Sequence, residues 1–574
     1  MSDPHPASTD ARRRWLALLV AAVATLPYLN TLGNGFAFDD FFLIRWHPMV
    51  TGSESPWHLL TWVQVPGAYR PLTMLSYAAN ERVSDGPFGY HLVNLCLHVL
   101  VSLGVFWLAV RLLRSSFAAA VAGLLFATHP VHTEAVSNVV GRAELLAAAL
   151  VLGALLAFLR AERARRRWRL VWMALSLLAF AAACFAKESA FAAVLLFAIT
   201  YIWLTPQWRV SRVAALLVLY TAAGAIYLGA RVPVVGALTI PGAPSLVDNP
   251  LAHVDGATRL RTAMIVLWQY LSMLLLPVNL TADSSFNEIP PAFSFTDPRF
   301  ALAGAALVTV ALLAARATRR IPALAIAALF LVVPLVLTAN VLFPIGTIKA
   351  ERLLYLPSVG WCLAWGALAA AAGRTRPQVW AALLAVVVTV YAGRSWARNR
   401  DWKDNLSLFS ATLAASPGSA KAQHNAATAL QGAGNLDDAL LHYRRALEIY
   451  PEYAAAAYGV GHVHHLRGNE DRAMQWYLRA LAIDPSLAKA HLQIGLIRLN
   501  HGEYDAAEAA FRTGLETAPD DPELVVYLGT VLLAQGDRWR ALNLVRYFAT
   551  LPPTDSETME AARYAQRELE VAVR

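Results

Sequence analysis

Long apolar segments follow one another through the first 400 residues, and they constrain the fold more than any other feature of the sequence. A helix needs about 20 apolar residues to cross the hydrocarbon core of a membrane. Of the 574 residues, 57% are hydrophobic and 15% are charged, which excludes an ordinary soluble protein. The sequence therefore predicts an all-α, polytopic membrane bundle, with apolar segments at about 15–33, 92–113, 116–128, 142–160, 169–186, 189–204, 212–230, 262–279, 299–315, 321–342, 353–372 and 378–394.

Arginine clusters beside these segments predict which helix ends face the cytoplasm. The clusters are Arg12 to Arg14, Arg111 with Arg114, Arg160 to Arg169, Arg209 with Arg212, Arg316 to Arg320, and Arg374 with Arg376. All of them fall on one side if segment 262–279 is re-entrant or interfacial, which leaves about 11 crossings. The first span is then retained and the N-terminus is cytoplasmic. The extracytoplasmic loops are 34–91, 129–141, 231–298 and 343–352, together with the short connection around residue 187.

A period of 34 residues marks the C-terminal part of the chain. Pro417, Pro451, Pro485 and Pro519 follow this step, and so do Gly434, Gly468, Gly502 and Gly536, as well as Ala439, Ala473, Ala507 and Ala541. This period, with small and aromatic residues at fixed places, is typical of tetratricopeptide repeats, which stack into an α-solenoid. We predict a membrane domain over 1–400 and a repeat domain over 401–574, with a half-unit at 401–417, repeats at about 417–552 and a C-terminal cap.

The charge balance differs between these two parts. Residues 1–400 contain 32 Lys and Arg against 17 Asp and Glu, whereas residues 401–574 contain 16 against 22. The basic excess of the first part lies in short runs beside apolar segments, as expected for contacts with lipid headgroups. The sequence therefore favours membrane lipids, and not nucleic acid, as partners of the basic residues.

Two adjacent carboxylates, Asp39 and Asp40, follow the first apolar segment and are flanked by phenylalanines. Ionised carboxylates so close to a membrane cost free energy, so they are usually paired or take part in function. One interpretation is a helix cap or a solvated loop. The other is a catalytic pair, because burial or coupled titration would raise a carboxyl pKa and suit a general base.

His91 and Asn94 lie on one helix face by their spacing, as does His98. They either bind substrate or form hydrogen bonds that brace neighbouring segments. His129, His132 and Glu134 form a second polar group, followed by Arg142 and Glu144. The same two alternatives apply to this second group.

A divalent metal is a further possibility for His129, His132 and Glu134, although their spacing matches no established ligand pattern. The three cysteines, Cys96, Cys184 and Cys362, also lack the spacing of a zinc site. The sequence therefore indicates no required cofactor, and a divalent metal at His129, His132 and Glu134 stays an open alternative.

Cationic residues gather in the predicted extracytoplasmic loops. Lys187 is followed by Glu188, and Glu351 and Arg352 precede Tyr355. Each pair of opposite charges either neutralises itself at a helix end or contributes to a site. A phosphate leaving group needs fixed positive charge. The candidates to bind it are Arg352, Lys187, Arg142 and Arg70. The candidates to bind substrate or brace the loops are Glu144, Glu188, Glu351 and Tyr355.

Taken together, these stretches resemble the transmembrane and tetratricopeptide-repeat O-mannosyltransferases of the GT-C glycosyltransferase superfamily, here as a bacterial relative. The resemblance covers nearly the whole chain in order. Its motifs are Phe38-Asp39-Asp40, Tyr69-Arg70-Pro71-Leu72, His91-Leu92-Val93-Asn94, His129-Pro130-Val131-His132-Thr133-Glu134-Ala135-Val136, Gly141-Arg142-Ala143-Glu144, Lys187-Glu188 and Glu351-Arg352-Leu353-Leu354-Tyr355-Leu356-Pro357-Ser358.

The resemblance implies an inverting glycosyltransferase that uses a polyprenyl-phosphate-linked sugar, mannose in the known family, on the extracytoplasmic face. It implies that Asp39 is the catalytic base, with Asp40 as the alternative, and that the lipid phosphate leaves toward Arg352 and Lys187. It also implies an acceptor protein or peptide presented by the repeats, and a location in the bacterial inner membrane with the repeats in the periplasm.

Two other functions would also use a membrane bundle with repeats. A membrane scaffold would use the repeats to recruit partners, but anchoring needs one or two helices and not eleven. A transporter of lipid-linked sugars would place ionisable residues near the middle of its spans, whereas the charged residues here lie at the ends. The sequence therefore favours the transferase.

Overall fold

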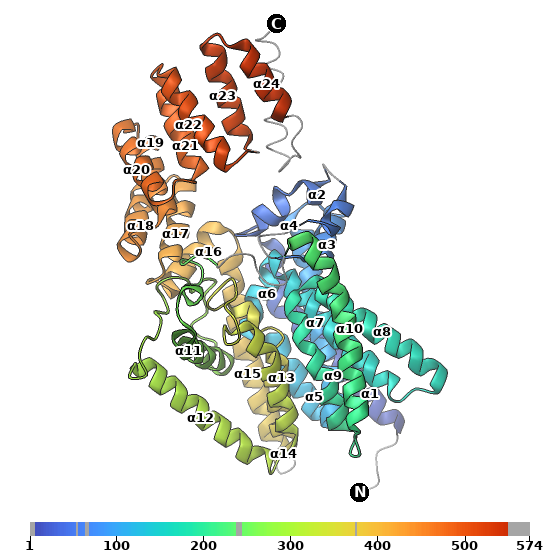
Figure 1. The fold of residues 1–574 in the computed structure, drawn as a ribbon. Coiled ribbons are helices and arrows are strands. Elements are labelled where there is room, and N and C mark those ends of the chain that lie inside the picture. Colours follow the sequence, from blue (N-terminus) through green and yellow to red (C-terminus); the bar gives the residue numbers. More distant parts are fainter. Residues whose placement is uncertain are drawn as a thin grey trace. The chain divides into compact units, whose positions relative to one another are not determined.

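The computed structural model describes residues 6–52, 55–62, 68–236, 244–372, 376–519 and 521–548. The chain divides into two compact units of helices (Figure 1). The first unit comprises Met1–Asp40, Pro56–Ser285 and Ile289–Ala411, and the second comprises Phe41–Ser55, Phe286–Glu288 and Thr412–Arg574. Apolar helices form the first unit and a repeat solenoid forms most of the second, so the predicted all-α class is confirmed.

Twelve longer helices of the described part of the first unit account for the predicted apolar segments. They are α1 (Pro6–Thr25), α4 (Pro87–Leu113), α5 (Ser116–Thr128), α7 (Arg142–Ala161), α8 (Arg166–Ala186), α9 (Val194–Leu204), α10 (Val210–Val235), α11 (Gly256–Leu275), α12 (Pro298–Thr318), α13 (Ala323–Thr338), α14 (Ser358–Ala372) and α15 (Pro377–Arg398). Helix α3 (Pro71–Glu81) lies between α1 and α4, and the short α6 (Thr133–Ser137) lies between α5 and α7. Helix α16 (Asn405–Ala415) follows α15 and leads from the first unit into the second. Proline occupies the first turn of α3, α4, α12 and α15, where its missing N–H costs no hydrogen bond.

Within the described residues, seven helical segments are long and apolar enough to cross a membrane. They are Asp10–Gly33, Pro87–Leu113, Val139–Ala161, Arg166–Ala186, Val210–Val235, Pro298–Thr318 and Gln378–Trp402. Four shorter apolar segments correspond to the remaining predicted spans, namely Ser116–Thr128, Glu188–Leu204, Ala323–Thr338 and Ser358–Ala372. The chain is a membrane protein, and the number of 11 crossings stays a prediction.

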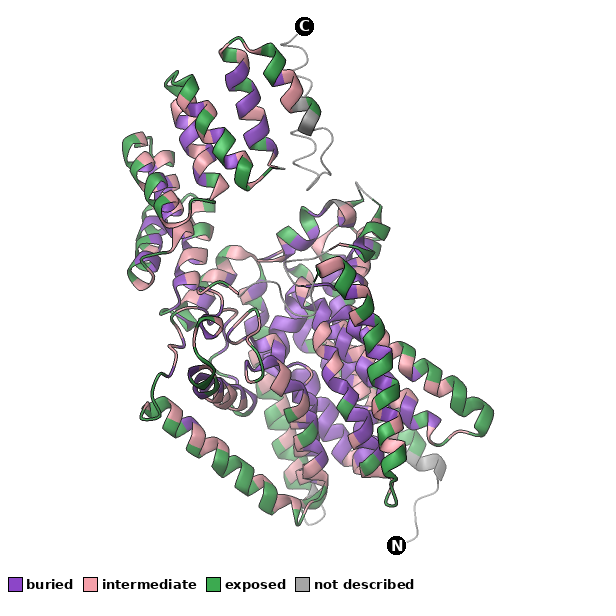
Figure 2. Cartoon of the chain, in the orientation of Figure 1, coloured by how far each residue is buried: buried purple, intermediate pink, exposed green. Residues whose placement is uncertain are grey.

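The centre of the first unit is formed by α4, α5, α7 and α14 (Figure 2). Small residues allow these helices to approach closely, which is how helices pack in a membrane. A Cβ atom on Gly366 of α14 would lie 2.6 Å from the carbonyl oxygen of Ala118 on α5. By contrast, Figure 2 shows α12 largely exposed, as expected for a helix whose surface faces lipid.

Helix α11 covers the segment for which we predicted a re-entrant or interfacial arrangement. It begins at Gly256, capped by the Asp255 side chain, and ends at Leu275, before Pro277. Arg261 in its second turn donates hydrogen bonds to the carbonyl oxygens of Ala292 and Phe293, at 2.8 and 2.9 Å. Helix α11 has 20 residues and is not among the segments apolar enough to span, and its re-entrant or interfacial arrangement stays a prediction.

The described residues of the second unit contain four helix pairs. They are α17 (Ala420–Gly432) with α18 (Leu436–Ile449), α19 (Ala454–Leu466) with α20 (Glu470–Ile483), α21 (Ala488–Asn500) with α22 (Tyr504–Thr517), and α23 (Pro522–Ala534) with α24 (Arg538–Phe548). The periodic glycines at 434, 468, 502 and 536 all have positive φ, which lets the backbone turn between the two helices of each pair. The periodic alanines are buried between the helices. The predicted repeats are confirmed as far as Phe548, and the predicted C-terminal cap lies outside the described residues.

The division between the units differs from the predicted boundary at residue 400. The first unit continues to Ala411, because segment 399–405 binds the loop that carries Asp39 and Asp40. Gly35 N donates a 2.9 Å hydrogen bond to the carbonyl oxygen of Lys403, and Asn34 Nδ2 donates one of 2.9 Å to that of Asn399. Most of the predicted half-unit 401–417 therefore belongs with the membrane helices.

Candidate active site

The two adjacent aspartates have different surroundings. Asp40 is buried, and its two carboxylate oxygens accept 3.0 Å hydrogen bonds from the backbone amides of Ala37 and Val140. Burial raises the pKa of Asp40 to about 7, although these amides act in the opposite direction. Asp40 thus joins the loop after the first span to the segment that begins α7.

Asp39 is half-buried in the turn that this arrangement holds. Phe38 precedes it in the left-handed region, with φ of 57°, which is unfavourable for a bulky residue. The amide of Phe38 donates a 2.7 Å hydrogen bond to Asn405 Oδ1, and its ring packs on Phe409. These contacts fix the backbone at Asp39 while Asp40 turns inward.

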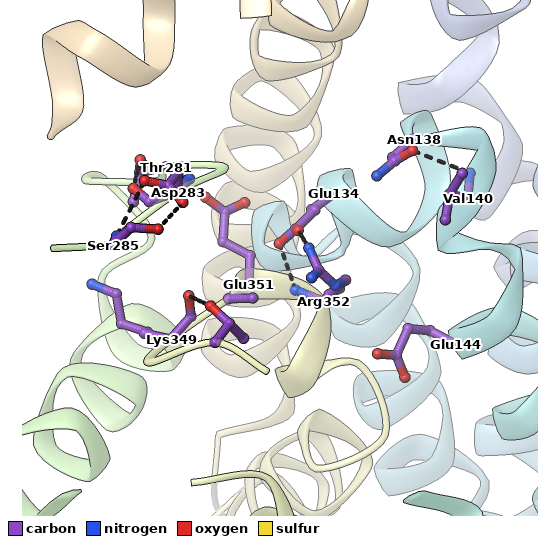
Figure 3. A network of polar contacts seen from close by, with 12 residues as sticks. Glu134, Asn138, Val140, Glu144, Thr281, Asp283, Ser285, Lys349, Glu351 and Arg352 are labelled. Atoms are coloured by element: carbon purple, nitrogen blue, oxygen red, sulfur yellow. Dashed lines mark hydrogen bonds and ion pairs between the residues drawn. The ribbon is translucent and has the colours of Figure 1, made fainter. Parts of the chain in front are cut away.

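The negative charge of Asp39 acts on Arg352. The backbone amide of Arg352 donates a 2.8 Å hydrogen bond to Glu134 Oε2, and its guanidinium forms an ion pair with Glu134 Oε1 (Figure 3). Burial lowers the pKa of Arg352, but Glu134 and Asp39 raise it more, so that it lies above its ordinary value. Glu134 is fully buried whereas 30% of the Arg352 side chain is exposed, so Glu134 holds a cation that remains accessible.

Four further charges, two cations and two anions, form alternating pairs beside this group. Lys187 forms an ion pair with Glu144, and Arg70 forms a bidentate pair with Glu188, with N–O distances of 2.9 and 2.6 Å. Burial lowers the pKa of Lys187 even though Glu144 opposes that shift. The charge of Glu144 acts on both Arg70 and Arg352, which connects the two pairs to the Asp39 region.

Arg142 does not fit the predicted role in phosphate binding. It is fully buried, and each of its side-chain nitrogens already donates a hydrogen bond, to acceptors on Asn94, Ser76, Asn80 and Tyr90. Its guanidinium also lies over the rings of Tyr77 and Tyr90, at 4.8 and 5.3 Å. The geometry gives Arg142 a bracing role between α3, α4 and α7.

The alternative of bracing also describes His91 and Asn94. His91 Nε2 lies 3.2 Å from the carbonyl oxygen of Gly35. Asn94 Nδ2 donates hydrogen bonds to the carbonyl oxygens of Asn138 and Val139, at 3.1 and 3.2 Å. Both side chains therefore connect α4 to the loops beside Asp39 and Asp40.

His129 and His132 are buried at the start of segment 129–141, which also holds Glu134. His129 Nε2 contacts the carbonyl oxygen of Leu274 at 3.0 Å, and His132 Nε2 contacts Ser358 Oγ at 2.8 Å. Burial lowers the pKa of His129 to about 4 and lowers that of His132 as well, so both are neutral near pH 7. The hydroxyl of Tyr355 lies 2.9 Å from His98 Nδ1, which makes Tyr355 part of the same buried group.

These contacts do not favour the metal alternative. The carboxylate of Glu134 is bound to Arg352, and the Nε2 atoms of both histidines already have partners. In the part of the chain that the structure describes, no group of three His, Cys, Asp or Glu side chains is arranged to hold a metal ion.

Glu351 takes part in a buried ion pair whose second member the sequence analysis missed. Arg398, at the end of α15, lies 3.2 Å from Glu351 Oε1 and 2.7 Å from Asp401 Oδ2. Burial raises the pKa of Glu351 to about 7, although Arg398 opposes that shift. The sequence signal for Arg398 was its position at the end of an apolar segment, beside the predicted domain boundary. Asn405, which binds the turn before Asp39, lies close to the same boundary. Both residues connect segment 398–405 to loops that hold charged side chains.

The arrangement provides one half-buried carboxylate, an accessible arginine held by a buried glutamate, and neighbouring cations in balanced pairs. A carboxylate can accept a proton from a hydroxyl group. An arginine can stabilise negative charge on a departing phosphate. The site therefore has the groups needed for transfer from a phosphate-linked donor to a hydroxyl acceptor.

Comparison with known proteins adds two family matches. The model for "Protein O-mannosyl-transferase TMTC, DUF1736" matches residues 243–312, which include α11 and most of α12. The tetratricopeptide-repeat model matches residues 424–488 and 492–549. The first match lies in the membrane unit and the second covers the solenoid.

The chain is also similar to individual proteins named protein O-mannosyl-transferases. It is 30% identical over 491 residues to protein O-mannosyl-transferase TMTC4 of Homo sapiens, covering 75% of this chain and 66% of that protein. It is 27% identical over 489 residues to protein O-mannosyl-transferase TMTC3 of Homo sapiens, covering 77% of this chain and 52% of that protein. The chain thus spans about half the length of TMTC3.

Among solved structures, the chain is similar to TTC0263, a tetratricopeptide-repeat protein of Thermus thermophilus. The identity is 23% and the TM-score is 0.25, with coverage of 31% of this chain and 94% of that one.

Proposed function

Because this chain belongs to the transmembrane and tetratricopeptide-repeat (TMTC) family, whose relatives above are named protein O-mannosyl-transferases, we propose that it is a glycosyltransferase acting on proteins. The donor is a sugar linked to a polyprenyl phosphate, and the acceptor is a hydroxyl group. Mannose is the sugar that the names of the relatives suggest. The reaction inverts the configuration of the anomeric carbon.

The observation that carries this proposal is the different environment of Asp39 and Asp40. The Asp40 carboxylate accepts hydrogen bonds from two backbone amides inside the protein. Asp39 is half-buried, and its charge interacts with that of Arg352. A base and a phosphate-binding cation must lie near each other, because the two substrates react in line between them.

In the proposed reaction, the acceptor oxygen forms a bond to the anomeric carbon as the bond from that carbon to the phosphate oxygen breaks. Asp39 accepts the hydroxyl proton. The electron pair of the broken bond stays on the polyprenyl phosphate, whose charge is stabilised by Arg352. Glu134 orients Arg352, and the ion pairs Lys187–Glu144 and Arg70–Glu188 lie beside this group without adding net charge.

The site faces the extracytoplasmic side in this proposal, and the repeats lie on the same side. The arginine clusters at the opposite helix ends support this orientation by the positive-inside rule. The repeat solenoid presents a segment of the acceptor polypeptide, since stacked helix pairs provide an extended binding surface. In a bacterium the location would be the inner membrane.

The test compares Asp39→Asn with Asp40→Asn in the full-length chain, at matched membrane abundance. Transfer from a synthetic polyprenyl-phosphate mannose to proteins of the native host is followed by mass spectrometry. Asp39→Asn should abolish transfer, whereas Asp40→Asn should retain a measurable part of it, because an amide oxygen can still accept one backbone hydrogen bond.

Two results would contradict the proposal. Full activity of Asp39→Asn would remove Asp39 as the base. Loss of activity only in Asp40→Asn, with unchanged thermal stability, would move the base to Asp40. A donor with a different sugar that reacts faster than the mannose donor would change the substrate and leave the reaction type intact.

A further inference from the structure

A cavity lined by arginines lies at the end of the bundle opposite the candidate active site. Its volume is about 220 Å³, and its walls come from the last turns of α4 and α7 and from the connection that follows α7. The lining residues are Trp107, Arg111, Leu156, Leu159, Arg160 and Arg163. Since α7 begins at Arg142 and rises 1.5 Å per residue over 20 residues, the cavity lies about 30 Å along the helix from the candidate site.

The charges of this cavity are not balanced by nearby carboxylates. The positive charges of Arg13, Arg160 and Arg163 all act against that of Arg111. Among the described residues, the structure pairs neither Arg111 nor Arg163 with an acidic side chain. Glu162 is the one carboxylate in the connection, and it is bound instead to Arg169 and Arg212, at 3.2 and 2.7 Å.

Of the lining arginines, Arg160 lies 6.0 Å from the ring centre of Trp172. Arg13 does not line the cavity, and its charge is partly balanced, because its guanidinium lies 3.5 Å from Asp10 Oδ1 and its Nε lies 3.4 Å from Ser116 Oγ. The carbonyl ends of α4 and α7 favour cations there, but this effect is small for each charge. Three guanidinium groups around one cavity therefore provide strong binding capacity for an anion with several oxygens.

The other half of the lining is apolar, which decides the class of anion. Trp107, Leu156 and Leu159 belong to helices that are apolar and long enough to cross a membrane. An indole ring at the end of such a helix is typical of the membrane interface. A small free anion would use the arginines and leave these side chains uncovered, whereas a lipid would cover both.

We propose that this cavity binds the phosphate headgroup of an anionic phospholipid, with Arg111, Arg160 and Arg163 around the phosphate and Trp107 against the upper part of an acyl chain. This site is independent of the proposed transferase reaction. Basic pockets between membrane helices are suited to such headgroups. The bound lipid would relieve the repulsion between the arginines and fix the ends of α4 and α7.

The test uses the full-length protein in detergent and measures lipid binding by native mass spectrometry. Phosphatidylglycerol and phosphatidylcholine with identical acyl chains are the probes. We expect the protein to retain phosphatidylglycerol selectively. The double variant Arg111→Gln/Arg163→Gln should weaken that binding by roughly 25-fold, since each basic residue near an anionic lipid contributes roughly a fivefold factor.

The matched control is Arg166→Gln/Arg167→Gln, which removes the same charge from the same basic run but changes no residue of the cavity lining. It should bind phosphatidylglycerol within about twofold of the unchanged protein. If both double variants weaken binding equally, the effect is one of net charge and the proposal is wrong. Equal binding of the two lipids would also overturn it.

A separate arm distinguishes the lipid from free phosphate. Inorganic phosphate at millimolar concentration should not displace phosphatidylglycerol, and complete displacement would assign the cavity to a free anion instead. If the double variant fails to fold, Arg163→Gln alone decides the result, because this exposed residue lies outside the helices. It should still weaken binding about fivefold, and unchanged binding would contradict the proposal.

Discussion

The side chain of Asn405 accepts a 2.7 Å hydrogen bond from the backbone amide of Phe38, 367 positions earlier in the sequence. Phe38 has a positive φ, and such a conformation costs on the order of 1–3 kcal/mol unless its surroundings hold it. Asn405 thus stabilises the turn that presents Asp39. The segment after the last apolar helix takes part in shaping the loop after the first.

Replacement of Asn405 by Leu should lower activity more than it lowers stability. The lost hydrogen bond contributes only about 1 kcal/mol to folding. The turn at Phe38 then loses its anchor, and a shift of Asp39 by about 1 Å can lower the rate roughly 100-fold. Transfer rates and the thermal unfolding temperature are measured on the same purified sample.

A second replacement serves as the control for this turn. Phe38→Asn places a residue that tolerates positive φ more readily than phenylalanine. In the Asn405→Leu background it should recover part of the activity. No recovery, together with normal stability of both variants, would contradict the link between this turn and Asp39.

The pH dependence of stability should change when Asp40 is replaced by Asn. The folded-state pKa of Asp40 is raised from the ordinary 3.8 to about 7, so between these values the folded protein binds the proton that the unfolded chain releases. Stability from this group is therefore present at low pH and is lost as the pH rises from about 4 to about 7.

Thermal unfolding temperatures of the unchanged protein and of Asp40→Asn, measured across pH 4 to 8, test this effect. The unchanged protein should lose stability relative to the variant over that window. Glu351 has a pKa raised in the same direction, and it is present in both proteins, so the difference between them isolates Asp40. A constant difference at all pH values would contradict the raised pKa.

A double-mutant experiment on Arg352 and Glu134 should show different effects on stability and on activity. Arg352→Gln leaves the buried Glu134 carboxylate without its cation, which should destabilise the fold by up to about 3 kcal/mol because Arg352 is partly exposed. Activity should fall roughly 10²–10³-fold. Adding Glu134→Gln should restore the unfolding temperature but not the activity. Recovery of both would show that Arg352 only neutralises Glu134.

Arg142→Lys should act mainly on folding. Lysine cannot reproduce the simultaneous hydrogen bonds to Asn94, Asn80 and Ser76, nor the stacking on Tyr77. The amount of folded protein in membranes should decrease, while the KM for the lipid-linked donor in the remaining protein stays unchanged. The comparison is Arg70→Lys. Because the Arg70 side chain is partly exposed, we expect its replacement to raise the KM for the donor. A raised KM for Arg142→Lys would restore its predicted role in phosphate binding.

The sequence indicated which residues are unusual more reliably than it indicated their roles. Arg142 and Arg352 are both arginines in polar loops between apolar segments, and nothing in the spacing separates them. In the structure, Arg142 is enclosed by side chains of α3 and α4, whereas Arg352 remains partly exposed. Exposure depends on which distant segments pack over a side chain, and a local pattern carries no such information.

The division between the two units depends on long-range contacts for a similar reason. A change in composition and a weak repeat pattern place the predicted boundary at residue 400, whereas the compact first unit continues to Ala411. The hydrogen bonds from Gly35 to Lys403 and from Phe38 to Asn405 attach the segment after residue 400 to the first unit. Each of them joins residues more than 360 positions apart.

The sequence by itself determined the helical class, the apolar segments and the repeat unit, because hydrophobic length and a period of 34 residues are local or periodic properties. It also brought Asp39 and Asp40 forward as a pair. Only the tertiary structure distinguished the two, by directing the amides of Ala37 and Val140 to Asp40 and leaving Asp39 in the electrostatic reach of Arg352. Adjacent residues point in different directions along a turn, and the long-range contacts decide which of them is buried.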